Sequence, residues 1–112
     1  MQLTRETLQH PGVFAGRPVQ KTITWKQGDQ ELTATTWIRP RSYQDIALET
    51  EAGKKNTIAV RIARSVCDEQ GEPVFTVADI TGEACPERGP LDAGLTVALL
   101  QAISDVYLGK TD

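Results

Sequence analysis

Apolar and polar residues alternate along residues 19–38, which is the pattern of two β-strands joined by a turn. On the first strand the apolar positions of one parity are Val19, Ile23 and Trp25. Gly28 lies at the centre of the interruption and suits the positive φ that a tight turn requires. Pro40 has no N–H for a strand ladder, so it ends the second strand. The pattern predicts an antiparallel β-hairpin.

Helix signals follow the hairpin. Ser42, with Asp45 three residues later, has the form of a capping box, and Gly53 suits the end of that helix. Residues 58–66 fit a further helix, because Ile58, Ile62 and Val66 recur every fourth position, but their alternation also fits a strand. Both interpretations stay open for residues 58–66.

A second capping box and a loop precede the last apolar segment. Thr76 and Asp79 have the capping-box spacing, and residues 82–90 contain two Gly and two Pro, which is typical of a loop. Pro90 suits the first turn of a helix, and Gly109 suits the position just past its end. We therefore expect a helix between these two residues.

The last helix carries more apolar residues than one core face needs. At 100° per residue, one broad face contains Leu91, Leu95, Ala98, Leu99, Ala102, Ile103 and Val106. A second apolar stripe contains Val97, Leu100, Tyr107 and Leu108. The polar strip that remains contains Gly94, Gln101 and Asp105.

A surface helix normally has a charged, solvated face, whereas extended apolar surface marks a contact with another molecule. We therefore expect a second copy or a client polypeptide to cover the stripe. The predicted protein-binding residues are Val97, Leu100, Ile103, Tyr107 and Leu108. The alternative is a central helix that its own chain covers on both sides.

These elements predict a small α+β fold. The expected order is an N-terminal antiparallel hairpin followed by three to four helices, of which the C-terminal one is apolar. A chain of 112 residues fits one domain, so we expect residues 1–112 to fold as a unit, with an irregular or flexible segment over residues 1–16.

Composition excludes several classes of protein. The net charge of −3 and pI near 5.1 argue against a nucleic-acid partner. The longest uncharged run, residues 93–104, is too short to span a membrane, and no secretion signal opens the chain. Residues 1–41 carry a net charge of +3 and residues 42–112 carry −6, which is either scatter or a means of orienting neighbouring copies.

The residues that could carry catalysis or bind metal do not form a known pattern. Cys67 or Cys85 with His10 would be needed for a Cys–His dyad, and neither cysteine lies in a nucleophile motif. A disulfide between the two cysteines is disfavoured in a reducing cytosol. Asp68 and Asp79 have the spacing of calcium-loop ends, but the residues between them do not fit that loop. We expect no catalytic site, no cofactor and no metal.

One stretch resembles a known family. Residues 62–76, IARSVCDEQGEPVFT, resemble the run V-x-D-E-x-G-x-P-V-F-T that follows a helix in tail assembly chaperones of long-tailed, non-contractile, siphovirus-type phages. Asp79, the apolar last helix, and the hairpin followed by residues 39–43 are also similar to that family. Cys67 stands where an aliphatic residue is expected, and cysteine packs as a small hydrophobe.

The resemblance implies a non-enzymatic assembly factor. Such proteins oligomerise, bind the long helical tape measure protein, and keep it soluble while tail tube protein polymerises around it. They act in the host cytoplasm and are absent from the finished virion, and a longer form often arises by a −1 frameshift. Two other hypotheses are a structural tail or head-completion protein retained in the virion, and a small ligand-binding or regulatory domain that uses Trp25 and Trp37.

Overall fold

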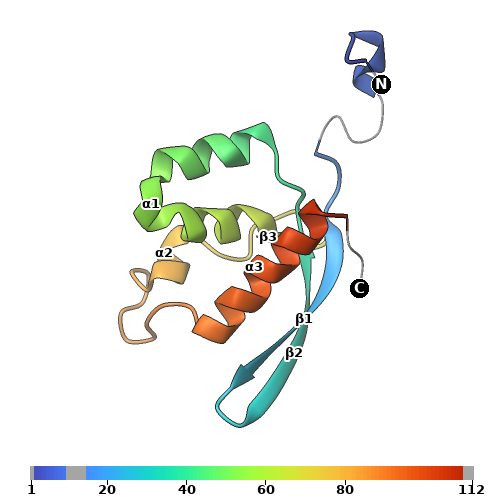
Figure 1. Cartoon of the computed structure of the whole chain (residues 1–112). Helices are drawn as coiled ribbons and strands as arrows, with labels where there is room; N and C mark the ends of the chain where they lie inside the picture. The colour runs from blue at the N-terminus through green and yellow to red at the C-terminus, as the bar shows by residue number, and fades with distance from the viewer. Residues whose placement is uncertain (1, 10–14, 110–112) are drawn as a thin grey trace.

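A computed structural model describes residues 2–9 and 15–109 (Figure 1), without the side chains of residues 54 and 55. The elements, in chain order, are η1 (Glu6–Gln9), β1 (Val19–Gln27), β2 (Gln30–Ile38), α1 (Tyr43–Ser65), β3 (Val66–Cys67), α2 (Val77–Thr81) and α3 (Ala93–Tyr107). This order confirms the predicted α+β class and the apolar C-terminal helix. Of the predicted irregular segment 1–16, residues 1 and 10–14 lie outside the described residues, and η1 buries none of its side chains.

The predicted hairpin is confirmed. β1 and β2 pair antiparallel from Val19↔Ile38 to Gln27↔Gln30, and Gly28 takes a φ of 64° in the turn. A third strand was not predicted: β3 contributes two residues that pair with the end of β2, giving the order β1-β2-β3.

α1 consists of two helical halves joined at a kink. Ser42 caps the first half through the predicted capping box, and Gly53 interrupts the helical dihedrals with φ 73° and ψ 178°. The second half continues to Ser65, and Val66 starts β3. Of residues 58–66, which fitted either a helix or a strand, residues 58–65 are therefore helical and only Val66 lies in a strand.

α2 and α3 begin at side-chain caps. Thr76 and Asp79 form the second predicted capping box. The prediction that Pro90 occupies the first turn of the last helix is wrong, because the Asp92 carboxylate accepts a hydrogen bond from the Leu95 N–H at 3.0 Å and starts α3 at Ala93. The aspartate side chain accepts the N–H at position N3 of the helix, whereas a proline side chain has no acceptor for it.

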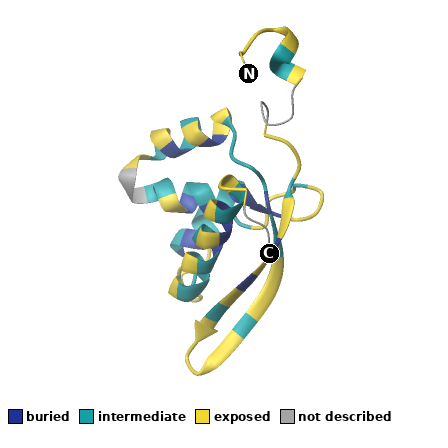
Figure 2. Cartoon of the chain, turned by 45° about the vertical axis from the view of Figure 1, so that its right-hand side comes forward, coloured by how far each residue is buried: buried dark blue, intermediate teal, exposed yellow. Residues whose placement is uncertain are grey.

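α1, α2 and α3 lie on one side of the sheet, and the far end of the hairpin extends beyond them (Figures 1 and 2). The core fills the space between β1, β2, the second half of α1 and α3. Its buried apolar residues are Ile23, Ile38, Ala59, Ile62, Val66, Ile80, Leu99, Ala102 and Ile103. No helix in the described part of the chain is long and apolar enough to cross a membrane.

Gly94 and Asp105, two of the three residues in the polar strip of α3, face β1, whereas Gln101 is exposed. Asp105 lies 4.0 Å from the ammonium group of Lys21, a residue that is 3% exposed. A Cβ added at Gly94 would lie 3.1 Å from the backbone oxygen of Lys26, so glycine allows the helix to approach the strand closely. The side of α3 away from the core and β1 therefore meets solvent.

Candidate functional site

Three of the five predicted protein-binding residues are exposed on α3. Val97 is 67% exposed, Tyr107 is 72% exposed, and Leu108, just past the helix, is 59% exposed. Leu100 is partly buried and packs against the core, and Ile103 is only 4% exposed and belongs to it. The prediction placed Ile103 on the binding surface, but in this protomer its side chain is used for core packing.

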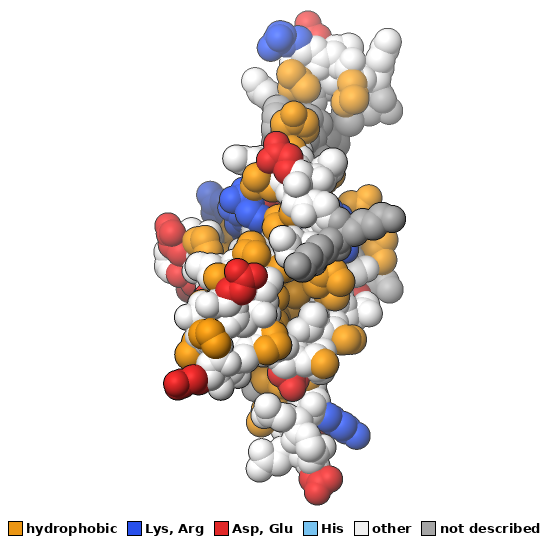
Figure 3. All heavy atoms as spheres, turned by 90° about the vertical axis from the view of Figure 1, so that its left-hand side faces the viewer, with side chains coloured by type: hydrophobic (Ala, Val, Ile, Leu, Met, Phe, Trp, Pro, Cys, Tyr) orange, Lys and Arg blue, Asp and Glu red, His pale blue; other side chains and the backbone are white. Residues whose placement is uncertain are grey.

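We call the surface formed by Val97, Leu100, Tyr107 and Leu108 the α3 stripe. The exposed residues between its members, Gln101 and Ser104, are polar but uncharged, and no charged residue lies between Asp92 and Asp105. In the space-filling view of Figure 3, hydrophobic side chains reach the surface at several places across the middle of the molecule, with acidic side chains among them. An uncharged apolar surface of this kind is suited to contact with another polypeptide.

The second structural feature is a set of arginine–carboxylate pairs that holds the first half of α1. Asp45 Oδ1 accepts from Arg64 Nε at 2.9 Å and from Arg39 at 3.4 Å, and its side chain is 3% exposed. Burial alone would raise the pKa of Asp45, but hydrogen bonds from the Ser42 N–H and from Arg64 lower it below its ordinary value. Asp45 is therefore held as a carboxylate.

Glu49, one helical turn later, makes the matching pair. Its carboxylate accepts from Arg41 at 2.8 Å and from Arg61 at 2.9 Å, and its side chain is 6% exposed. Arg39 and Arg41 thus pair with acids of their own chain, as does Lys21. This leaves less of the N-terminal positive charge to orient a neighbouring copy than the sequence alone indicated.

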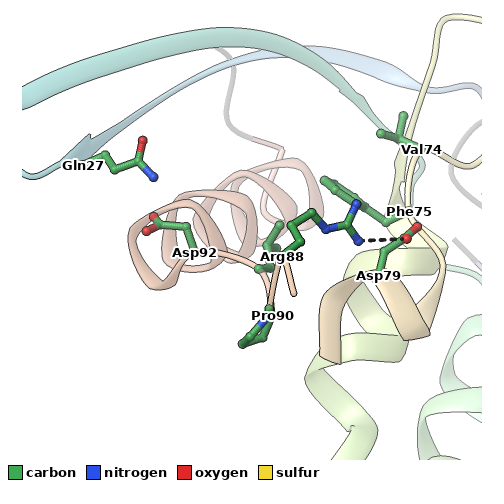
Figure 4. Close-up of a pocket in the computed structure, with 9 residues that line it drawn as sticks. Gln27, Val74, Phe75, Asp79, Arg88, Pro90 and Asp92 are labelled. Carbon is green, nitrogen blue, oxygen red and sulfur yellow. Dashed lines mark hydrogen bonds and ion pairs between the residues drawn. The ribbon is translucent and has the colours of Figure 1, made fainter. Parts of the chain in front are cut away.

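A cleft of about 430 Å³ lies between the end of the hairpin, the segment before α2 and the loop before α3 (Figure 4). Its lining residues are Gln27, Val74, Phe75, Asp79, Arg88, Gly89, Pro90, Leu91 and Asp92. Asp79 accepts from the Thr76 N–H and from Arg88, at 2.9 and 3.3 Å, and these bonds lower the pKa of Asp79. Asp92 caps α3.

Both carboxylates of the cleft are therefore committed to helix caps, and neither is placed as a general base. The apolar residues Val74, Phe75, Pro90 and Leu91 also line the cleft.

The candidate cysteine and metal chemistry finds no support among the described residues. Cys67 is 2% exposed, burial raises the pKa of its thiol, and Cys85 is exposed, both as free thiols. His10 lies outside the described residues, so the Cys–His dyad is untested. Asp68 accepts two backbone N–H groups within its own turn, and the described chain contains no group of three or more His, Cys, Asp or Glu residues able to hold a metal ion.

The two tryptophans do not form a joint ligand surface. Trp25 packs against the core, on the face of the sheet that α3 covers. Trp37 is the neighbour of buried Ile38 on β2, so its side chain lies on the opposite face. A binding site that needs both rings together is therefore not present on this hairpin.

The arginine–carboxylate pairs were missed by the sequence analysis. The signal was present, because Asp45 and Glu49 are four residues apart and Arg61 and Arg64 are three apart, so each pair shares a helix face. What the sequence did not show is that the kink at Gly53 turns the two faces toward each other.

Comparison with known proteins agrees with the resemblance noted from the sequence. The family model described as "Phage tail assembly chaperone, TAC" matches residues 6–107, from η1 to the end of α3. No curated protein and no solved structure matched the chain. The match covers the hairpin, the helix pair and the α3 stripe almost completely, and the chain belongs to the phage tail assembly chaperone family.

Proposed function

We propose that this chaperone binds the tape measure protein and keeps it soluble while the tail tube assembles. The observation that supports the proposal is the α3 stripe, where Val97, Tyr107 and Leu108 are more than half exposed on a helix with no charged residue between its cap and Asp105. A long helical client exposes apolar faces before assembly, and an uncharged helix surface can cover such faces as in helix-in-groove recognition.

In this proposal the protein acts as an oligomer. Copies associate through the α3 stripe, and together they offer the client a longer apolar surface than one protomer has. Burial of the stripe contributes roughly 5 kcal/mol at ~25 cal/mol per Å² before the costs of association. A contact of this strength is reversible, which suits a factor that must leave the client when tube protein replaces it.

The proposed activity is binding alone. The acids of the cleft cap helices, and Cys67 is buried. We therefore propose a non-enzymatic role in the host cytoplasm, with interaction with tail tube protein during assembly and no copies in the mature virion. Mass spectrometry of purified virions tests the last point, because a retained structural protein would appear there in stoichiometric amount.

Co-expression with the tape measure protein of the same phage tests client binding. The wild-type chain should keep the client in the soluble fraction, and Val97→Asp should not, because the charge lies where the client would be covered. Ala84→Asp is the matched control, since it adds the same charge at an exposed residue of the loop before α3. Equal client solubility with wild type and Val97→Asp would remove the α3 stripe from the proposal.

A further inference from the structure

In the first half of α1, residues 43–52, the two buried residues are acidic, and the exposed residues include two large apolar ones. Its inward face carries the carboxylates of Asp45 and Glu49, which are 3% and 6% exposed. Its outward face carries Tyr43, which is 87% exposed, and Ile46, which is 54% exposed. A surface helix normally turns its apolar side to the core, so this arrangement requires an explanation.

The ion pairs fix the orientation of this helix. Asp45 and Glu49 each accept from two arginines, and none of the residues 43–52 belongs to the apolar core. Turning Tyr43 and Ile46 inward would take both carboxylates away from their arginines and leave buried charge unpaired, which is strongly unfavourable. The apolar face is therefore held toward solvent by the protomer itself.

We infer that this outward face, formed by Tyr43, Ile46, Ala47 and Thr50 and here called the α1 face, binds the α3 stripe of a second copy. The inference rests on the proposed function, in which the α3 stripe is a self-association surface. It adds the identity of the opposing surface.

The α1 face and the α3 stripe match in charge and in length. Neither has a charged residue at its centre, and the Thr50 hydroxyl already donates to the Ile46 backbone oxygen at 2.9 Å, so its proton is not left unpaired by a dry contact. At 1.5 Å per residue the α1 face is about 10 Å long and the α3 stripe about 16 Å long, so the shorter face fits within the longer one.

The contact must form between two copies. Figures 1 and 2 both show the second half of α1 between residues 43–52 and α3, so the two surfaces of one chain cannot meet. A contact between two different surfaces is heterologous, and each added copy leaves one α1 face and one α3 stripe available. Assembly can then continue beyond a dimer, whereas a symmetric pairing of two α3 stripes would stop at two copies.

Two single variants and their mixture test the inference by sedimentation velocity. Ile46→Asp places a carboxylate in the α1 face, and Val97→Asp places one in the α3 stripe. Each should weaken self-association about tenfold or more, because the contact would bury an unpaired carboxylate. A 1:1 mixture should recover a heterodimer and nothing larger, because one intact α1 face on Val97→Asp meets one intact α3 stripe on Ile46→Asp. Gln44→Asp, on the same helix but about 100° from Tyr43 and about 160° from Ile46, should assemble as the wild type does.

The outcomes separate this inference from the proposed function. If Ile46→Asp assembles normally while Val97→Asp is monomeric, the α1 face is wrong and the α3 stripe remains a self-association surface. If both variants assemble normally, or the wild type is monomeric at all concentrations, the proposed self-association fails. Two monomeric variants whose mixture gives no heterodimer contradict a direct contact, provided that far-UV circular dichroism shows both variants folded.

Discussion

Replacement of Asp45 by Asn is expected to lower the free energy of unfolding by about 2–4 kcal/mol. In the native chain Oδ1 accepts from Arg64 and Arg39, and Oδ2 accepts from the Ser42 N–H at 2.9 Å and the Ser42 hydroxyl at 3.1 Å. An asparagine has one oxygen and one NH₂ group in the same positions. Whichever way the amide is placed, its NH₂ faces donors on one side, so one set of bonds is lost.

The magnitude follows from how deeply each partner is buried. Breaking a buried ion pair by removing one partner costs about 3–5 kcal/mol when the remaining charge stays dry. Asp45 itself is 3% exposed, but the side chains of Arg39 and Arg64 are 33% and 32% exposed. Both arginines can turn part of their charge to water in the variant, which lowers the expected cost to about 2–4 kcal/mol.

Asp79→Asn is the matched control. Asp79 occupies the same position of a capping box, accepts from the Thr76 N–H at 2.9 Å, and pairs with one arginine at 3.3 Å. It differs in exposure, because the side chains of Asp79 and Arg88 are 32% and 58% exposed. Its replacement should lower the free energy of unfolding clearly less than that of Asp45, as for an exposed cap and a surface ion pair.

The measurement is urea denaturation of both variants at pH 7, followed by tryptophan fluorescence and far-UV circular dichroism. Low protein concentration keeps self-association out of the comparison. The difference between variants is taken from the midpoints at equal slope. If Asp45→Asn costs no more than Asp79→Asn, then burial of the network does not stabilise the first half of α1, and the reasoning is refuted.

Three further predictions concern pH, thiol reactivity and backbone conformation. The pKa of Asp45 is lower in the folded chain than in the unfolded chain. The stabilisation from the Asp45 carboxylate is therefore complete above the unfolded pKa near 3.9 and is lost as the pH falls through the folded pKa. Below about pH 4, the free energy of unfolding should fall more steeply with decreasing pH in wild type than in Asp45→Asn. A thiol reagent should label exposed Cys85 rapidly and buried Cys67 only upon unfolding, and rapid labelling of both would contradict the packing of β3. Gly82→Ala should destabilise the fold by about 2 kcal/mol or more, because φ is 93° and the new Cβ would lie 2.8 Å from the backbone nitrogen of residue 90. Gly28 has a φ of 64° and open space around the position of a Cβ, so Gly28→Ala should cost only about 1 kcal/mol. Urea denaturation measures both costs.

The elements that could be predicted from the sequence are those whose signals are local. The hairpin has a two-residue alternation and a glycine at its turn, and both capping boxes are contained within four residues. β3 was missed because two residues carry no periodicity, and its pairing with β2 depends on where α1 ends. The start of α3 was misplaced because Pro90 and Asp92 are both acceptable near a helix start, and only the Leu95 bond decides between them.

A helical wheel does not separate the residues of the binding surface from those of the core face where the two faces of α3 meet. Ile103 and Leu100 lie about 60° apart at 100° per residue, and both border the two apolar faces. Which of them enters the core depends on the exact rotation of α3 against β1, and that rotation is set by the close approach at Gly94 and by Asp105 beside Lys21. The sequence alone does not show that Gly94 and Asp105 pack against β1.

The exposed apolar surfaces follow from the one-sided architecture. A hairpin with helices on only one face offers a limited apolar area, and α3 together with the second half of α1 fills it, as the membership of the core shows. The first half of α1 is left outside this core, and ion pairs to Arg39, Arg41, Arg61 and Arg64 hold it in place instead of apolar packing. Because the ion pairs occupy the inward face of that helix, Tyr43 and Ile46 are left on its outward face. The same shortage of core area leaves Val97 and Tyr107 uncovered on α3, so both surfaces arise from one physical cause and both are available to other polypeptides.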